Sequence, residues 1–216
     1  GMMGAATALL LKQPITELWR SQREAVPIAL DRSKHGAVVN MRTSSGKTRV
    51  AELAILQTLH THPNAKILYL APFRSLALEI EQTLGQVFDW CGFHVSHLYG
   101  GFRLSAADRQ LAEDSSITIA TPEKARAILR SSPELFDNVQ LIVVDEGHLI
   151  GANERLVKNE LFLDHLRFIA NASDCRVMML SAVLPNPAHL AEWVTGDSDN
   201  FVRSEWKPSA ERFGLL

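Results

Sequence analysis

Residues 38–52 read VVNMRTSSGKTRVAE, a run of branched apolar side chains followed by a short polar segment. The apolar run is typical of a buried strand, and the spacing after Thr48 is compatible with a helix. A phosphate-binding loop has this form and ends in Gly-Lys-Thr, as residues 46–48 do, but it normally has a glycine where this chain has Met41. Gly-Lys followed by Ser or Thr arises by chance in about one chain in ten of this length, so the loop alone does not establish a site.

Short apolar runs alternate with helix-length patterns along the chain. The strands that we expect lie at 36–41, 65–71, 93–100, 116–121, 139–146 and 176–182. The helices that we expect lie at 15–32, with a possible break near Pro27, and at 47–60, 73–90, 104–113, 122–131, 153–171 and 186–195. Strands that are apolar on both faces and alternate with helices form parallel sheets covered on both sides. The sequence therefore predicts a single doubly wound α/β domain.

Polar residues follow each of the six expected strands. In chain order these segments are RTSSGKT, PFRS, GG, TPEK, DEGH and SAV. Open α/β sheets bind ligands at the carboxyl ends of their strands, so a functional edge should carry such residues. Polar strand ends are common in any fold, but their occurrence after all six strands favours a site at this edge.

Composition excludes several classes of protein. The 216 residues are 46% hydrophobic and 21% charged, which is ordinary for a globular protein, and the net charge of −2 excludes a protein that coats nucleic acid by bulk positive charge. Cys91 and Cys175 are too far apart for metal-ligand or redox spacing and indicate reduced thiols. The apolar segment 5–11 is too short for a membrane span, and Gly1 before Met2 is interpreted as a tag scar. We expect a cytoplasmic protein.

The polar segment after the first strand has the chemistry of a phosphate site. Gly46 allows backbone N–H groups to approach a phosphate, and the following helix offers its positive N-terminal end. Lys47 is suited to the β and γ phosphates, and the Thr48 hydroxyl is suited to Mg²⁺. The nucleotide-binding set that we expect is Thr43, Ser44, Ser45, Gly46, Lys47 and Thr48. The alternative is a helix N-terminus with a solvated lysine.

The fifth expected strand, in LIVVDEGH, ends in two carboxylates. Burying Asp145 and Glu146 is costly unless a cation meets them, and a Mg²⁺–nucleotide complex held by Lys47 and Thr48 is such a partner. Asp145 would hold the metal through a water molecule, and Glu146 would orient and deprotonate the attacking water. The alternative, an acidic N-cap for the next helix, loses weight once a phosphate loop follows another strand.

In this order, the segments resemble the first RecA-like domain of a superfamily 2 DExH-box helicase of the superkiller type. TSSGKT resembles motif I, in which that superfamily commonly has alanine at the position of Met41. The other matching segments, from about residue 15 to 208, are LWRSQREAV (18–26, Q motif), APFRSLALE (71–79, motif Ia), YGG (99–101, the glycine motif), ATPEKA (120–125, the Thr-Pro-Glu motif), DEGHLIG (145–151, motif II) and LSAVLPNP (180–187, motif III).

The resemblance implies roles for further residues on the ATP side. Gln22 would read adenine with the donor and acceptor of its amide, although the same residue could be an exposed helix glutamine. Trp19 on the same helix is more often a core residue than a stacking platform. Ser181 and His148 would couple the γ-phosphate to the nucleic-acid loops, a link that lacks one hydroxyl because Val183 stands where threonine is usual.

The resemblance also implies a track for RNA or DNA across the other half of the sheet edge. Helix N-termini, close backbone approach and a few cations would hold the sugar-phosphate backbone without reading bases. The residues that we expect on this track are Arg74, Gly100, Gly101, Arg103, Thr121 and Lys124.

The domain plan follows from the same resemblance. Residues 1–14 would be an N-terminal extension, 15–203 the ATP-binding domain, and 204–216 the start of a linker to a second RecA-like domain, whose arginine fingers hydrolysis requires. The leading interpretation is the N-terminal ATP-binding domain of an ATP-dependent helicase, nearly inactive alone. A translocase that does not separate strands and a non-catalytic nucleotide-binding module remain as alternatives.

Overall fold

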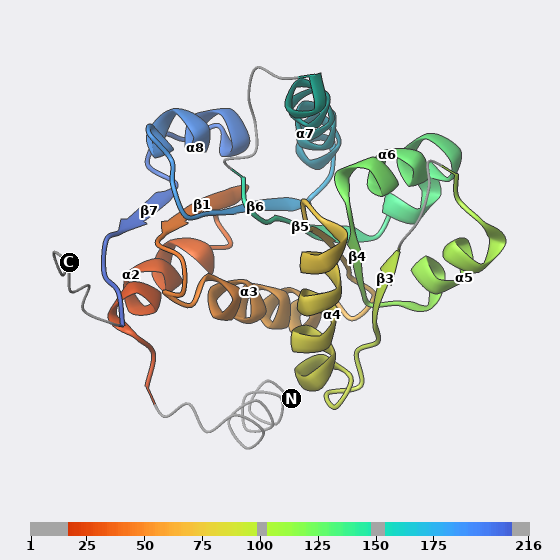
Figure 1. Cartoon of the computed structure of the whole chain (residues 1–216), viewed down its shortest axis with the longest axis horizontal. Helices are drawn as coiled ribbons and strands as arrows, with labels where there is room; N and C mark the ends of the chain where they lie inside the picture. Colours follow the sequence, from red (N-terminus) through yellow and green to blue (C-terminus); the bar gives the residue numbers. More distant parts are fainter. Residues whose placement is uncertain (1–16, 99–102, 148–153, 209–216) are drawn as a thin grey trace, which may run out of the picture.

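The computed structural model describes residues 17–98, 103–147 and 154–208. These residues form a seven-stranded sheet with helices packed around it (Figure 1). The six expected strands are present, and a seventh extends the sheet beside β1. Every pairing between these strands is parallel, in the spatial order β3-β4-β2-β5-β6-β1-β7. The strands are β1 (Gly36–Met41), β2 (Lys66–Leu70), β3 (Val95–Leu98), β4 (Ile117–Ala120), β5 (Val139–Val144), β6 (Arg176–Ser181) and β7 (Phe201–Ser204). The predicted parallel α/β sheet is confirmed.

Helices cover both faces of the sheet. Figure 1 shows α2, α3 and α4 on one face, α6, α7 and α8 on the other, and α5 beside the edge strand β3. Their bounds are α2 (Arg20–Ala29), α3 (Lys47–Thr61), α4 (Arg74–Phe88), α5 (Ala106–Asp114), α6 (Pro122–Ser131), α7 (Glu154–Ala172) and α8 (Pro187–Thr195), and a 3₁₀ turn η1 (Pro133–Phe136) follows α6. This covering explains why β1 is buried along its whole length.

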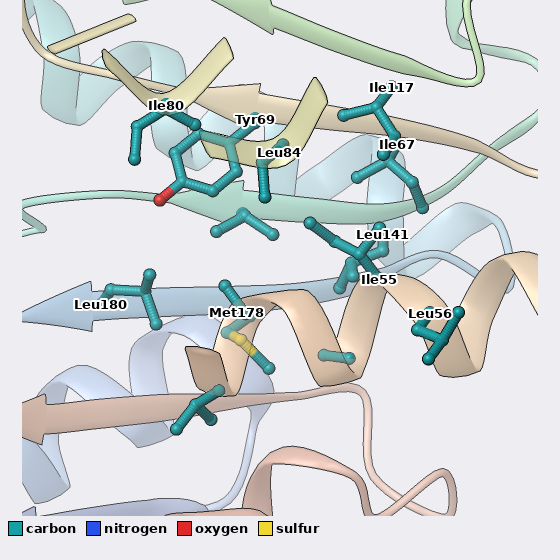
Figure 2. Close-up of a cluster of buried hydrophobic side chains, with 14 of the residues drawn as sticks. Ile55, Leu56, Ile67, Tyr69, Ile80, Leu84, Ile117, Leu141, Met178 and Leu180 are labelled. Atoms are coloured by element: carbon teal, nitrogen blue, oxygen red, sulfur yellow. The ribbon is translucent and has the colours of Figure 1, made fainter. Parts of the chain in front are cut away.

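Two apolar cores lie on the two faces because successive strand residues point to opposite sides. In β1, Val39 and Met41 belong to the core beneath α2, α3 and α4, whereas Val38 belongs to the core beneath α6, α7 and α8. Figure 2 shows the first core, in which the Tyr69 ring lies among Ile80 and Leu84 and its hydroxyl points toward the carboxyl ends of the strands.

The helix expected at 15–32 is α2, which begins at Arg20 and ends at Ala29. Pro27 lies inside it and does not break it. Proline costs a helix the hydrogen bond that its missing N–H would make, here in the last turn. Ala25 and Ala29 are fully buried against the core, and this packing holds the turn in place.

The strand order divides the carboxyl edge of the sheet into two halves. β6 lies between β5 and β1, so the loops that follow these three strands are neighbours. The loops that follow β2, β4 and β3 form the other half of the edge. The predicted ATP-site residues that the structure describes therefore fall mostly on one half, and the described nucleic-acid residues fall on the other.

Candidate functional site

The loop between β1 and α3 folds into a tight turn. Ser44 and Gly46 have left-handed backbones, with φ of 61° and 86°. The Ser45 N–H donates to the Arg42 carbonyl over 3.2 Å, and the Ser45 hydroxyl donates to the same oxygen. Ser45 is fully buried, whereas Thr43 and Ser44 are exposed at the mouth of the loop. Ser45 thus holds the turn in place, while Thr43 and Ser44 remain accessible to solvent.

Met41 fits the first position of the loop because a glycine is not needed there. It is the last residue of β1, and its buried side chain packs in the core beneath α3. Ser44 and Glu146 are the non-glycine residues with positive φ in the described chain, so the backbone at Met41 is one that any residue can adopt. Its carbonyl accepts from Lys47 Nζ over 3.2 Å, which holds the lysine over the loop.

Helix α2 holds the loop from the side. The Ser21 hydroxyl donates to the Ser45 carbonyl (2.9 Å), and Gln22 Nε2 donates to the Gly46 carbonyl (3.3 Å). Gln22 Oε1 also accepts from the Trp19 N–H (2.9 Å). Gln22 is 5% exposed, and each end of its amide keeps one further hydrogen-bonding site for a ligand. Its contact with adenine stays a prediction.

Two residues beside the loop differ from what the sequence suggested. Ser21 was not singled out, because a serine before the glutamine of a helix carries no signal of its own. Trp19, interpreted as a core residue, is the N-cap of α2 and is 44% exposed, with its ring 5.9 Å from that of Trp206.

The turn after β5 carries the two carboxylates. Asp145 Oδ2 accepts from the Tyr69 hydroxyl and Oδ1 accepts from the Glu146 N–H, both over 2.8 Å. Burial raises the pKa of Asp145, while the hydrogen bonds from Tyr69 and Glu146 and the positive charge of Lys47 act in the opposite direction. Glu146 has a left-handed backbone with φ of 49°, which is strained for a residue with a side chain. Lys47 is thus close enough to Asp145 to act on its charge.

The same turn packs directly on the end of β6. The Gly147 N–H donates to the Leu180 carbonyl over 2.8 Å, and a Cβ added at Gly147 would lie 2.3 Å from Met179 Cγ. The Ser181 hydroxyl, in motif III, donates to the Val183 carbonyl (3.3 Å). Motifs II and III are therefore joined through the backbone. His148, the expected partner of Ser181, lies outside the described residues.

Four of the predicted nucleic-acid residues are described, and they come from the other half of the sheet edge. Arg74 is the first residue of α4 and is exposed, and Arg103 is exposed before α5. Thr121 is the N-cap of α6, and its hydroxyl accepts from the Lys124 N–H over 3.4 Å. Gly100 and Gly101 lie outside the described residues.

Lys124 occupies an interior position that its motif did not suggest. Its side chain is 2% exposed, and Nζ donates to Asp108 Oδ2 (2.7 Å) and to the Arg103 carbonyl (3.0 Å). Asp108 in turn forms a capping box with Ser105 at the start of α5. Lys124 therefore ties the start of α6 to α5 and to the loop before it, and its ammonium group faces the protein.

Comparison with known proteins agrees with this geometry. Residues 19–190 match the model of the DEAD/DEAH box helicase family. The chain belongs to this family. Within it, the parallel sheet and the solved helicase structures that it resembles identify the chain as the first RecA-like domain of a superfamily 2 helicase.

Several known proteins are similar to the chain over nearly its whole length. It is 44% identical over 208 residues to the Hachiman protein HamB of Bacillus cereus, covering 96% of this chain and 18% of that protein. It is 32% identical over 210 residues to the ATP-dependent DNA helicase Hel308 of Pyrococcus horikoshii, covering 96% of this chain and 27% of that protein. The chain thus spans less than a third of these relatives.

The helicase fold is also present in solved structures. The DUF1998 helicase MrfA bound to DNA and AMPPNP superposes with a TM-score of 0.79 at 28% identity, covering 95% of this chain and 29% of that one. MrfA bound to DNA alone gives a TM-score of 0.77 at 27% identity, with 93% of this chain and 29% of that one covered.

No described helix of this chain is both long and apolar enough to cross a membrane.

The donor set of this helicase domain fits Mg²⁺ held together with a nucleotide. The described residues contain no group of three or more His, Cys, Asp or Glu able to hold a metal by themselves. One carboxylate and one hydroxyl, from Asp145 and Thr48, suit a hard cation that keeps several waters and takes phosphate oxygens as further ligands. The raised pKa of Asp145, caused first by burial, indicates a carboxylate that a nearby cation would stabilise.

Proposed function

We propose that this chain is the ATP-binding half of the motor core of a DNA-dependent helicase. The observation that carries the proposal is that Lys47 begins the helix after β1 while Asp145 follows β5, so the two residues come from the loops on either side of β6. Relatives described as ATP-dependent DNA helicases, and a helicase of the same fold bound to DNA and AMPPNP, support the choice of ATP and DNA.

The chain's own residues suggest the division of labour. Lys47 stabilises negative charge on the β and γ phosphates, and Gln22 reads adenine while it holds the loop. Thr48 and Asp145 hold Mg²⁺, which would neutralise the charge that develops on the phosphates. Glu146, on the strained turn after Asp145, accepts a proton from the attacking water.

On the DNA side, we propose a backbone track across the starts of α4 and α6. Arg74 and Arg103 are the exposed cations of the residues expected there, and both helices direct N–H groups toward the edge. Such contacts hold phosphates without reading bases, as a motor that moves along any sequence requires.

Hydrolysis is proposed to need an arginine from a second RecA-like domain. Supplying such a residue raises turnover about 10³–10⁵-fold in related phosphate chemistry. The isolated chain should therefore bind nucleotide and turn it over at least about 10³-fold more slowly than the full-length protein with DNA.

Calorimetric titration of the chain with Mg²⁺-ADP and with a non-hydrolysable ATP analogue tests the binding part. Lys47→Ala should abolish binding, whereas Lys34→Ala, which removes the same charge before the amino end of β1, should not. In the full-length protein, Glu146→Gln should keep binding and lose hydrolysis. Full turnover by that variant would disprove the role of Glu146, and DNA-stimulated hydrolysis without strand displacement would indicate a translocase.

A further inference from the structure

Tyr69 is a core residue whose hydroxyl reaches the candidate site. Its side chain is fully buried in the cluster with Ile80 and Leu84 (Figure 2). A phenylalanine would fill the same apolar space, so packing alone does not account for the hydroxyl. A buried tyrosine hydroxyl requires a hydrogen-bond partner, and here that partner is Asp145 Oδ2 at 2.8 Å.

The sheet register brings these two residues together. Tyr69 on β2 is paired in parallel with Val143 on β5, and the ladder continues as the Asp145 N–H donates to the Leu70 carbonyl over 2.9 Å. Residues two apart along a strand share a face. Asp145 therefore points to the same side of the sheet as Tyr69, just past the end of its ring.

The two hydrogen bonds fix the carboxylate of Asp145 at both oxygens. Tyr69 donates to Oδ2 from the core side, and the Glu146 N–H donates to Oδ1 from the turn. An ionised carboxylate has about four acceptor positions, so about two are left for a metal or its waters. The Tyr69 hydroxyl is the donor in its hydrogen bond, because an ionised carboxylate oxygen can only accept.

We propose that Tyr69 is a positioning residue for Mg²⁺, which holds the Asp145 carboxylate in the orientation that receives the metal of a bound Mg²⁺-nucleotide. The inference rests on the proposed function. Hydrogen bonds to a ligating carboxylate fix its orientation, and losing them typically weakens metal binding or activity by about 10–100-fold. Tyr69 supplies such a bond from β2, a rigid strand beneath the site.

The test measures metal dependence of binding in the full-length protein rather than turnover alone. The affinity for ADP is titrated at a series of Mg²⁺ concentrations and again in EDTA, for wild type and Tyr69→Phe. Mg²⁺ should raise the affinity for ADP. In the variant, we expect the Mg²⁺ concentration that gives half of this increase in affinity to rise on the order of tenfold. The affinity in EDTA should stay the same, because the phosphate loop is intact.

A matched control removes another buried hydroxyl from the same side of the sheet. Thr58 on α3 is buried, and its hydroxyl donates to the Ala54 carbonyl over 2.9 Å, within its own helix. Thr58→Val should leave the Mg²⁺ dependence unchanged even if both variants lose some thermal stability. That contrast separates an effect on the metal site from an effect on the fold.

Three outcomes would overturn the inference. An unchanged Mg²⁺ dependence in Tyr69→Phe, or an equal loss of ADP affinity with Mg²⁺ and with EDTA, would show that the hydroxyl serves packing only. If wild type bound no nucleotide under either condition, the proposed function would fail and the role of Tyr69 would fail with it. A wild-type enhancement by Mg²⁺ that the variant fully retains would refute the positioning role alone.

Discussion

At the scale of single residues, Gly46 combines a left-handed backbone with a close neighbour at the place of a side chain. Its φ of 86° is strained for other residues, and a Cβ there would lie 2.1 Å from Gln22 Nε2. Gly46→Ala should therefore abolish nucleotide binding and destabilise the fold by more than the about 1–2 kcal/mol that a left-handed alanine costs. Calorimetry and urea unfolding would measure both effects.

The matched control is Gly92→Ala. Gly92 has nearly the same φ, 84°, but a Cβ there meets nothing within 4 Å. Gly92→Ala should lose only the about 1–2 kcal/mol of stability that a left-handed backbone costs alanine, and it should keep nucleotide binding. Equal destabilisation by the two substitutions would mean that the contact between Gly46 and Gln22 does not constrain the loop.

Sequence reasoning could predict some of these residues and not others, for a physical reason. Lys47, Thr48 and Asp145 belong to local patterns whose chemistry can be interpreted within a few residues. Tyr69 and Ser21 act through partners 76 and 24 residues away, and each has an ordinary explanation as a strand aromatic or a helix serine. Long-range contacts of this kind depend on the strand order, which the sequence pattern alone does not specify.

At the scale of elements, two basic residues near the starts of α4 and α6, Arg74 and Lys124, are expected to have different roles. Arg74 is exposed at the first residue of α4, whereas Lys124 is buried against Asp108. In the full-length protein, Arg74→Met should lower the slope of log affinity for DNA against log salt by about 1, because one phosphate contact is lost. Lys124→Met should leave that slope unchanged and should destabilise the fold by about 3 kcal/mol, because it leaves Asp108 without its buried partner.

Salt titrations of DNA binding and urea unfolding of both variants distinguish these roles. If Lys124→Met lowered the slope of log affinity for DNA against log salt without a loss of stability, Lys124 would be a DNA-backbone contact. The prediction of a strand at 116–121 followed by a helix at 122–131 was correct for this region, since β4 ends at Ala120 and α6 spans Pro122–Ser131. The direction of the Lys124 side chain could not be predicted, because it depends on Asp108, which belongs to another helix.

At the scale of the whole molecule, the stability of the fold should depend on pH, because an acidic side chain is buried where helices cover the sheet. Glu52 on α3 is buried and pairs with Arg49. Burial raises the pKa of Glu52 from 4.5 to about 7, because desolvation exceeds the attraction of Arg49. The folded protein thus holds this proton at pH values where the unfolded chain has lost it.

The sign of the pH effect follows from that difference. Because the folded pKa is above the unfolded one, the contribution of Glu52 to the free energy of unfolding is complete below pH 4.5 and is lost as the pH rises to about 7. The loss amounts to about 3 kcal/mol for a shift of this size. Glu52→Gln removes the titration, so its stability relative to wild type should rise across this window and level off above it, as measured by urea unfolding from pH 4 to 8.

A contrasting variant checks that the slope belongs to Glu52. The half-buried Asp31 has a lowered pKa because its carboxylate accepts hydrogen bonds from the Ser33 hydroxyl and N–H, so its contribution to stability is lost as the pH falls. Asp31→Asn should therefore lose stability relative to wild type as the pH rises from acid to neutral, the opposite direction to Glu52→Gln. A difference between Glu52→Gln and wild type that is the same at pH 4.5 and pH 8 would mean that the pKa of Glu52 is not raised by folding. The attraction of Arg49 would then balance the cost of burying the Glu52 carboxylate.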